Sequence, residues 1–236
     1  MENSSISGTS KKRIAIYDMD KTVTRRATYT GFLVHMAMHR APWRLMLAPT
    51  ILLGALLYVL KIWSRGRLKE FSQALLIGRR VPRNEWALYA NSYADKVIAN
   101  NIYPQARARI ADEKAAGYTH VIATASYRLY VDAIAEKLGF DYVIATDLAS
   151  DARGNILASI DGDNCYDNAK LDKVKQWIKQ QGLSRADCHI RAYSDHVSDA
   201  PLLDYADEAY ATNPHPPLTQ MAQAKGWQIL DWRGTP

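Results

Sequence analysis

Residues 13–24 have the sequence RIAIYDMDKTVT, in which four apolar residues run directly into two aspartates that are one residue apart. An apolar run of this kind predicts a short buried strand that ends in a polar loop. Asp18 and Asp20 then follow the carboxyl end of the strand, which is where open α/β sheets bind their ligands. The stretch therefore predicts an α/β fold with a polar site at this strand end.

The two aspartates have three interpretations. The first is a solvated acidic turn at the end of a strand. The second is a calcium loop, but such a loop has Gly at its sixth position and Glu at its twelfth, where this chain has Val23 and Tyr29. The third is phosphoryl transfer, in which one carboxylate attacks phosphorus, its neighbour handles the proton and Mg²⁺ ties them together.

Hydroxyl groups follow a second predicted strand, at residues 120–123. Thr124 and Ser126 lie just before a predicted helix. There a hydroxyl together with the main-chain N–H groups of the turn can hold phosphate oxygens. The alternative is an ordinary helix N-cap.

Acidic residues follow a later predicted strand, at residues 189–193, in the sequence AYSDHVSDAPLL. Asp195 and Asp199 are either a capped helix start or, paired with Asp18 and Asp20, the acidic end of a Mg²⁺ site. Hard oxygen ligands of this kind suit Mg²⁺.

In their order along the chain these motifs resemble the haloacid dehalogenase (HAD) superfamily, whose first motif is Asp-x-Asp-x-Thr after a strand. The resemblance covers residues 13–213 apart from an insertion, and it is to the subclass that includes phosphoserine-phosphatase-like and phosphatidylglycerophosphatase-like proteins. The chain departs from the pattern at Lys21, where many relatives have Gly; the lysine adds a positive charge beside the site and leaves the chemistry intact.

The resemblance implies a role for each motif residue. Asp18 is the nucleophile and Asp20 the acid and base. Thr124 and Lys170 bind the phosphoryl group, with Ser126 as a further phosphate contact and Lys173 as the alternative lysine. It implies Mg²⁺ as cofactor, held by Asp18, the main-chain carbonyl of Asp20, and Asp195, with Asp199 supporting the metal waters and Lys170.

Helical and strand patterns divide the chain. Residues 11–24 and 101–236 alternate strand and helix, which predicts a Rossmann-like parallel sheet of about five strands, with a short hairpin at residues 155–164. Residues 25–100 have only helical periods, which predicts an all-helical cap inserted between the first strand and the rest. Residues 1–10 are polar and Ser-rich, so we expect a flexible tail that is not a secretory signal.

Charge is unevenly distributed. Residues 1–80 contain 14 Lys/Arg against 4 Asp/Glu, and the remainder contains 16 against 20. Residues 45–60, LMLAPTILLGALLYVL, carry no charge and are flanked by basic and aromatic residues. An interfacial anchor has this pattern, and so does a core helix of a small cap. The basic first third indicates an anionic partner: a phosphate substrate or an acidic membrane surface contacted through residues 40–67. No nucleic-acid-binding pattern is present, so we expect no such partner.

The resemblance to the HAD superfamily implies a Mg²⁺-dependent phosphomonoester hydrolase that forms an aspartyl-phosphate. Its substrate is either a membrane phospholipid phosphate such as phosphatidylglycerol phosphate or a small soluble ester such as phosphoserine or another phosphorylated amino alcohol. Phosphotransfer to an alcohol and a non-catalytic binding role are the alternatives. With only Cys165 and Cys188, expected as reduced thiols, we predict a cytoplasmic protein, associated in the lipid case with the inner face of the membrane.

Overall fold

The strands of the computed structural model, which describes residues 11–234, form one sheet. They are β1 Lys12–Tyr17, β2 Arg80–Val81, β3 Thr119–Tyr127, β4 Tyr142–Ser150, β5 Ile156–Asp161, β6 Cys188–Ser194, β7 Glu208–Thr212 and β8 Gln228–Leu230. Their order across the sheet is β2-β5-β4-β3-β1-β6-β7-β8. In this order, each neighbouring pair from β4 through β3, β1, β6 and β7 to β8 is parallel. The α/β prediction is confirmed, and the sheet is larger than the five strands expected. The predicted tail at residues 1–10 lies outside the described residues.

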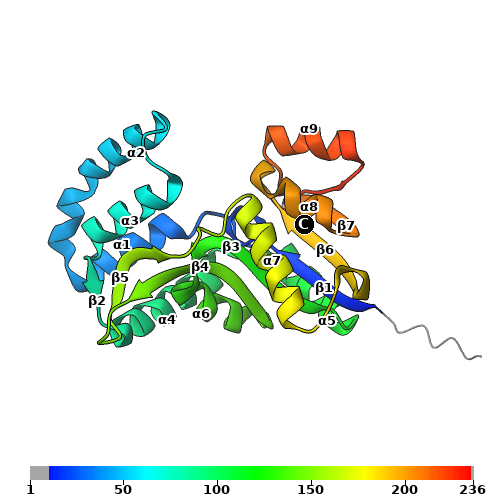
Figure 1. The fold of residues 1–236 in the computed structure, drawn as a ribbon, viewed down its shortest axis with the longest axis horizontal. Helices are drawn as coiled ribbons and strands as arrows, with labels where there is room; N and C mark the ends of the chain where they lie inside the picture. The colour runs from blue at the N-terminus through cyan, green and yellow to red at the C-terminus, as the bar shows by residue number, and fades with distance from the viewer. Residues whose placement is uncertain (1–10, 235–236) are drawn as a thin grey trace, which may run out of the picture.

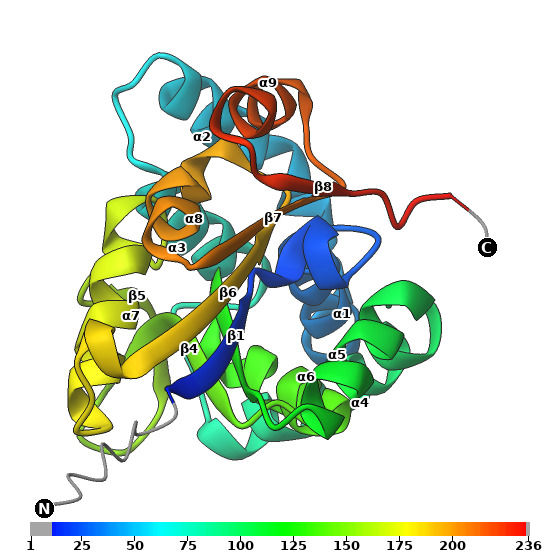
Figure 2. The ribbon, with the colours of Figure 1, turned by 90° about the vertical axis from the view of Figure 1, so that its right-hand side faces the viewer.

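Helices cover both faces of this sheet (Figures 1 and 2). The α-helices are α1 Tyr29–Arg40, α2 Ile51–Val59, α3 Arg65–Leu76, α4 Arg83–Asn100, α5 Pro104–Ala115, α6 Arg128–Leu138, α7 Asn168–Gln180, α8 Ala200–Tyr205 and α9 Pro216–Lys225. Other helical segments, which are not regular α-helices, are η1 Met19–Val23, η2 Pro42–Thr50, η3 Arg185–Asp187 and η4 Val197–Asp199. Helices α4, α5 and α6 lie on one face, and α7, α8 and α9 lie on the other (Figure 1).

The alternation of side chains along β1 produces these two layers. Ile14 and Ile16 are fully buried in the core that includes residues of α7, α8 and α9. Ala15 and Tyr17 are fully buried in the core that includes residues of α1, α4, α5 and α6. Because both faces of the strand are buried, its apolar run is continuous, as in parallel sheets generally.

The insertion at residues 25–100 contacts the sheet domain through aromatic stacking and through strand pairing. Phe32 of α1 stacks on Tyr130 of α6 with ring centroids 4.4 Å apart, and it also stacks on Trp86 of α4. Residues 155–164 contain one strand, β5, which pairs antiparallel with β4 rather than forming a hairpin by themselves. The two-residue strand β2 pairs antiparallel with β5, so the insertion is not entirely helical. Such a short strand has no periodicity by which a sequence could reveal it. The proposed domain boundaries stay a prediction.

The uncharged run lies on the outside of the insertion, in η2 and α2 (Figure 1). Of residues Pro42–Val59 only 6 % are buried, and the segment is long and apolar enough to cross a membrane by length and composition alone. Its large side chains are exposed to solvent, including Met46, Leu52, Leu53 and Val59. The segment therefore does not form the closed core of a cap.

Candidate active site

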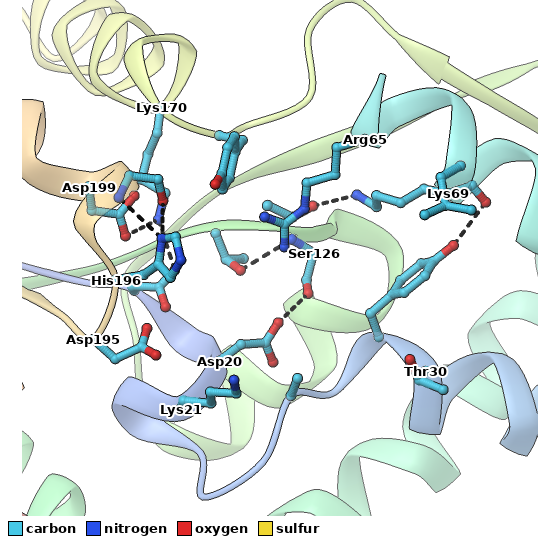
Figure 3. A pocket seen from close by; sticks show the side chains of 18 of the residues that line it. Asp20, Lys21, Thr30, Arg65, Lys69, Ser126, Lys170, Asp195, His196 and Asp199 are labelled. Atoms are coloured by element: carbon cyan, nitrogen blue, oxygen red, sulfur yellow. Dashed lines mark hydrogen bonds and ion pairs between the residues drawn. The ribbon is translucent and has the colours of Figure 1, made fainter. Parts of the chain in front are cut away.

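The predicted site residues meet where three neighbouring parallel strands end. Asp18 follows β1, Thr124 lies toward the end of β3, and Asp195 follows β6. Because β1 lies between β3 and β6, the chain reverses its direction across the sheet at this point, which is where such sheets place ligands. A cavity of about 560 Å³ opens here (Figure 3). All the predicted site residues line it, namely Asp18, Asp20, Thr124, Ser126, Lys170, Asp195 and Asp199.

Lys170 joins two of the carboxylates. It lies in the first turn of α7, is 2 % exposed, and donates from Nζ to Asp18 Oδ1 at 2.8 Å and to Asp199 Oδ2 at 2.7 Å. Burial alone would lower the pKa of Lys170, but Asp18 and Asp199 raise it above its ordinary value. The ammonium is therefore charged. Lys173, the alternative lysine, is not among the residues that line the cavity, so the geometry favours Lys170.

Asp18 is in an acidic environment despite its lysine partner. Burial raises the pKa of Asp18, Lys170 opposes this rise, and Asp199 and Asp195 add to it. The pKa of Asp195 is likewise raised by burial and by Asp199. Both pKa values are raised because three carboxylates lie close together and only one ammonium, that of Lys170, is shared between two of them. The cluster lacks positive charge, and a cation bound here would be stabilised.

Asp20 points away from this cluster. Its Oδ1 accepts hydrogen bonds from the main-chain N–H of Thr28 at 2.7 Å and the Thr28 hydroxyl at 2.8 Å, and its Oδ2 accepts from Ser126 Oγ at 2.8 Å. The two neighbouring aspartates thus have different surroundings, one among carboxylates and the other among neutral donors. Different surroundings are what divide the roles of paired carboxylates in catalysis.

The hydroxyl residues in the last part of β3 lie close together. Thr124 is nearly fully buried, and its Oγ1 accepts from the main-chain N–H of Ser126 at 3.2 Å. The strand continues to Tyr127, with an irregular register between Ala123 and Tyr127. This irregular segment turns the Ser126 hydroxyl toward Asp20 (Figure 3).

The backbone of Lys21 has a conformation that glycine adopts more easily than other residues. Its φ of 63° lies in the left-handed region that favours glycine. Asn213 supports this turn by donating from Nδ2 to the Lys21 carbonyl at 3.2 Å, while its Oδ1 accepts from the main-chain N–H of Trp232. The loop that follows β1 is thereby tied to the C-terminal part of the sheet.

The residues present fit Mg²⁺. Their donors are hard oxygens in a region of excess negative charge, and Asp199 Oδ1 is buried with no hydrogen-bond partner in the described part of the chain. Between residues 11 and 234 no three His, Cys, Asp or Glu side chains are grouped so as to hold a metal by themselves. The implied ligand set has only two side chains, because its third member is the main-chain carbonyl of Asp20.

Several residues that line the cavity, or that hydrogen-bond to residues lining it, were not predicted. Thr28 immediately precedes α1, where a threonine is a recognisable cap signal. Ser194, in the same motif as Asp195, donates to Asp199 Oδ2 at 2.6 Å. From the insertion, Arg65 and Lys69 line the cavity beside residues of α2 (Figure 3). Nothing in the local sequence distinguishes those two from solvated basic residues.

Comparison with known proteins agrees with this geometry. The haloacid dehalogenase-like hydrolase family matches residues 15–204, most of the chain. The chain is 28 % identical over 228 residues to the inhibition of morphological differentiation protein of Streptomyces azureus, covering 92 % of this chain and 78 % of that protein. It is 28 % identical over 160 residues to a phosphoserine phosphatase of Mycobacterium tuberculosis, covering 68 % of this chain and 50 % of that protein.

A solved structure resembles nearly the whole chain. It is that of a protein of unknown function from Bordetella pertussis, which is 26 % identical and superposes with a TM-score of 0.82 over 94 % of this chain and all of that one. The chain belongs to the haloacid dehalogenase-like hydrolase family. Within that family it is a phosphatase, in agreement with the prediction from its motifs.

Proposed function

We propose that this phosphatase is a Mg²⁺-dependent phosphomonoesterase that works through an aspartyl-phosphate on Asp18 and acts on a phosphate monoester carried by a membrane phospholipid, such as phosphatidylglycerol phosphate. The choice of substrate rests on α2, which lines the catalytic cavity with some side chains and exposes apolar side chains to solvent with others. Ile51 and Tyr58 line the catalytic cavity. Leu52, Leu53 and Leu56 of the same helix are 73 %, 61 % and 52 % exposed.

In the first step an Asp18 oxygen attacks phosphorus, and the bond from phosphorus to the ester oxygen breaks. Asp20 gives its proton to that oxygen, so the product leaves as a neutral alcohol. Lys170 and Thr124 bind the equatorial oxygens of the phosphoryl group, whose dispersed charge makes positioning and electrostatics the main catalytic contributions. The product of this step is an aspartyl-phosphate.

In the second step a water molecule attacks the phosphorus of the aspartyl-phosphate. Asp20, now ionised, takes the proton of that water, the bond from phosphorus to the Asp18 oxygen breaks, and inorganic phosphate is released. Asp18, Asp195 and the main-chain carbonyl of Asp20 would hold Mg²⁺, with Asp199 supporting its waters. When bound, the ion supplies positive charge to the phosphoryl oxygens and fixes their orientation.

The surface around α2 supports contact with an anionic bilayer. Lys61, Arg65 and Arg67 follow the helix and are exposed, which suits a negatively charged lipid surface. Arg40 and Arg44, which precede it, instead donate to main-chain carbonyls of the insertion. An apolar helix beside free basic residues is typical of an interfacial segment.

The proposal places the protein at the inner, cytoplasmic face of the membrane. Its support is that the two cysteines, Cys165 and Cys188, are free thiols, as expected in a reducing compartment.

The second candidate is a small soluble ester such as phosphoserine, favoured by the name of the Mycobacterium tuberculosis relative. Such a substrate presents an amine, which a carboxylate would recognise. The four carboxylates that line the cavity are Asp18, Asp20, Asp195 and Asp199, all of which have roles in the proposed chemistry. Among residues 11–234 the cavity has no further acidic group, which favours the lipid substrate.

The substrate proposal predicts the outcome of a phosphate-release assay. With Mg²⁺ present, the kcat/KM on phosphatidylglycerol phosphate in mixed micelles should exceed that on phosphoserine by about 100-fold or more, since apolar contacts add binding energy that a small ester cannot supply. Removal of Mg²⁺ with a chelator should abolish both activities. A preference for phosphoserine would overturn the lipid assignment while leaving the phosphatase chemistry in place.

The membrane-contact proposal is tested with the triple variant Leu52→Gln/Leu53→Gln/Leu56→Gln. Its binding to vesicles of phosphatidylglycerol and phosphatidylcholine should fall by roughly 100-fold or more, since each buried leucine contributes about 1.5–3 kcal/mol. Activity on p-nitrophenyl phosphate should be retained. The matched control is Leu88→Gln, an exposed leucine on α4, which should bind vesicles like the unmodified protein. Equal binding by the triple variant and the control would exclude this surface.

A further inference from the structure

Lys69 is a buried lysine from the insertion that reaches the irregular last part of β3. It lies on α3, is 7 % exposed, and donates from Nζ to the main-chain carbonyl of Ala125 at 2.7 Å and to Asn164 Oδ1 at 3.0 Å. Its ammonium also lies 4.3 Å from the centre of the Tyr127 ring. None of these partners is a carboxylate, so the charge is buried without an ionic partner in the described chain.

Burying a lysine ammonium without an ionic partner costs folding free energy. Burial, and then the nearby Arg65, lower the pKa of Lys69 to about 7, and Asp20 acts in the opposite direction. A buried polar group that opposes stability is retained most readily where it has a functional role. The contacts of Lys69 indicate what that role is.

We propose that Lys69 is a positioning residue that couples the insertion to Asp20 through the peptide between Ala125 and Ser126. A peptide unit is planar, so anchoring the Ala125 carbonyl also fixes the direction of the Ser126 N–H. That N–H donates to Thr124 Oγ1, and the Ser126 hydroxyl donates to Asp20 Oδ2. Lys69 is thus linked to the acid that would protonate the leaving group by two hydrogen bonds and the peptide unit between them.

A second set of contacts points to the same role. Thr146 Oγ1 on β4 donates to the Ala125 carbonyl at 2.8 Å and lies 3.0 Å from Asn164 Oδ1, the two oxygens that Lys69 also contacts. Asn164 lies in the segment that leads into α7, where Lys170 binds Asp18. Lys69 therefore connects α3 to the two loops that carry the phosphate-binding groups. When the insertion is in place, these loops are held in one arrangement.

The consequence concerns proton transfer. This inference rests on the proposed role of Asp20, which matters most when the leaving alcohol needs a proton. An alkyl phosphate expels a strongly basic oxygen and depends on the acid, whereas p-nitrophenyl phosphate expels a stable phenolate and depends on it much less. Disturbing Lys69 should therefore affect the two substrates unequally.

The test compares Lys69→Met with the unmodified protein on hexyl phosphate and on p-nitrophenyl phosphate. For hexyl phosphate the kcat/KM should fall by about 100-fold, the loss typical of a catalytic group misplaced by about 1 Å. For p-nitrophenyl phosphate it should fall less than about tenfold. The Tm should change by only a few degrees, because the methionine removes an uncompensated buried charge while filling a similar volume. Lys179→Met, an exposed lysine on α7, is the matched control and should leave both activities unchanged.

An equal loss on the two substrates, or none on either, would overturn the inference. Asp20→Asn, measured in parallel, separates the two levels of the argument. If Asp20→Asn loses far more activity on hexyl phosphate than on p-nitrophenyl phosphate and Lys69→Met does not, the coupling through Lys69 is wrong and the proposed chemistry stands. If neither variant distinguishes the substrates, the acid role of Asp20 fails, and the inference fails with it.

Discussion

Asp18→Asn is expected to abolish turnover, with kcat lowered by at least about 10⁴-fold, in the range seen when a catalytic nucleophile is removed. The amide cannot form the aspartyl-phosphate, although it keeps an oxygen that can accept from Lys170, as the carboxylate does at 2.8 Å. The fold should be retained, because the substitution removes one negative charge from a buried group that includes Asp195 and Asp199. We therefore expect a Tm equal to or above that of the unmodified protein.

Two measurements check this prediction. Activity on p-nitrophenyl phosphate gives the loss of kcat, and mass spectrometry after acid quenching should find phosphate on the peptide containing Asp18 in the unmodified protein alone. Asp172→Asn, an exposed aspartate on α7, is the control for the chemical change and should have normal activity. An active, folded Asp18→Asn protein would refute the assignment of the nucleophile.

Lys170→Met is expected to affect both activity and stability. Its ammonium is the group that Asp18 and Asp199 share, and both carboxylates are buried. Removing one partner of a buried ion pair leaves uncompensated charge, which typically costs about 3–5 kcal/mol of the free energy of unfolding. The kcat should fall by roughly 10³-fold, because the phosphoryl group loses a preorganised positive charge.

Lys173→Met is the matched control, since Lys173 lies one turn further along the same helix and is not among the residues that line the cavity. Urea unfolding should be measured with a chelator present, so that no divalent cation replaces the missing charge. The double variant Asp18→Asn/Lys170→Met should recover part of the lost stability, because one of the two orphaned carboxylates is then neutral. Equal stability of Lys170→Met and Lys173→Met would show that the shared ammonium does not hold the two carboxylates together.

The parallel core was predictable because its signal is local. The apolar run before Asp18 is continuous since both faces of β1 are buried, and the run at residues 121–123 in β3 has the same property. Strands β2 and β8 were missed. They contain two and three residues, and β8 is largely exposed, so neither has a pattern of burial that a sequence can display.

The sequence could predict that the motif residues lie close together in space because of a property of parallel sheets. Their strands all end at one edge, so polar residues that follow the strands lie near one another even when they are far apart along the chain. Asp18, Thr124 and Asp195 were placed in this way, and the structure puts all three at one cavity. Thr28 and Lys69 follow no strand of the core, so this argument did not reach them. Lys69 meets its partner across 56 residues.

The sequence by itself determined the class of fold, the family resemblance and the carboxylates at the strand ends, because these depend on local periodicity and on the geometry that all parallel sheets share. Only the tertiary structure showed that the apolar run at Pro42–Val59 is mostly exposed, since an interfacial helix and a core helix have the same composition and differ in what packs against them. It also decided that Asp18 shares a lysine with Asp199 while Asp20 is held by neutral donors. Two aspartates one residue apart are chemically equivalent in the sequence, and they acquire different surroundings only when distant segments of the chain pack around them.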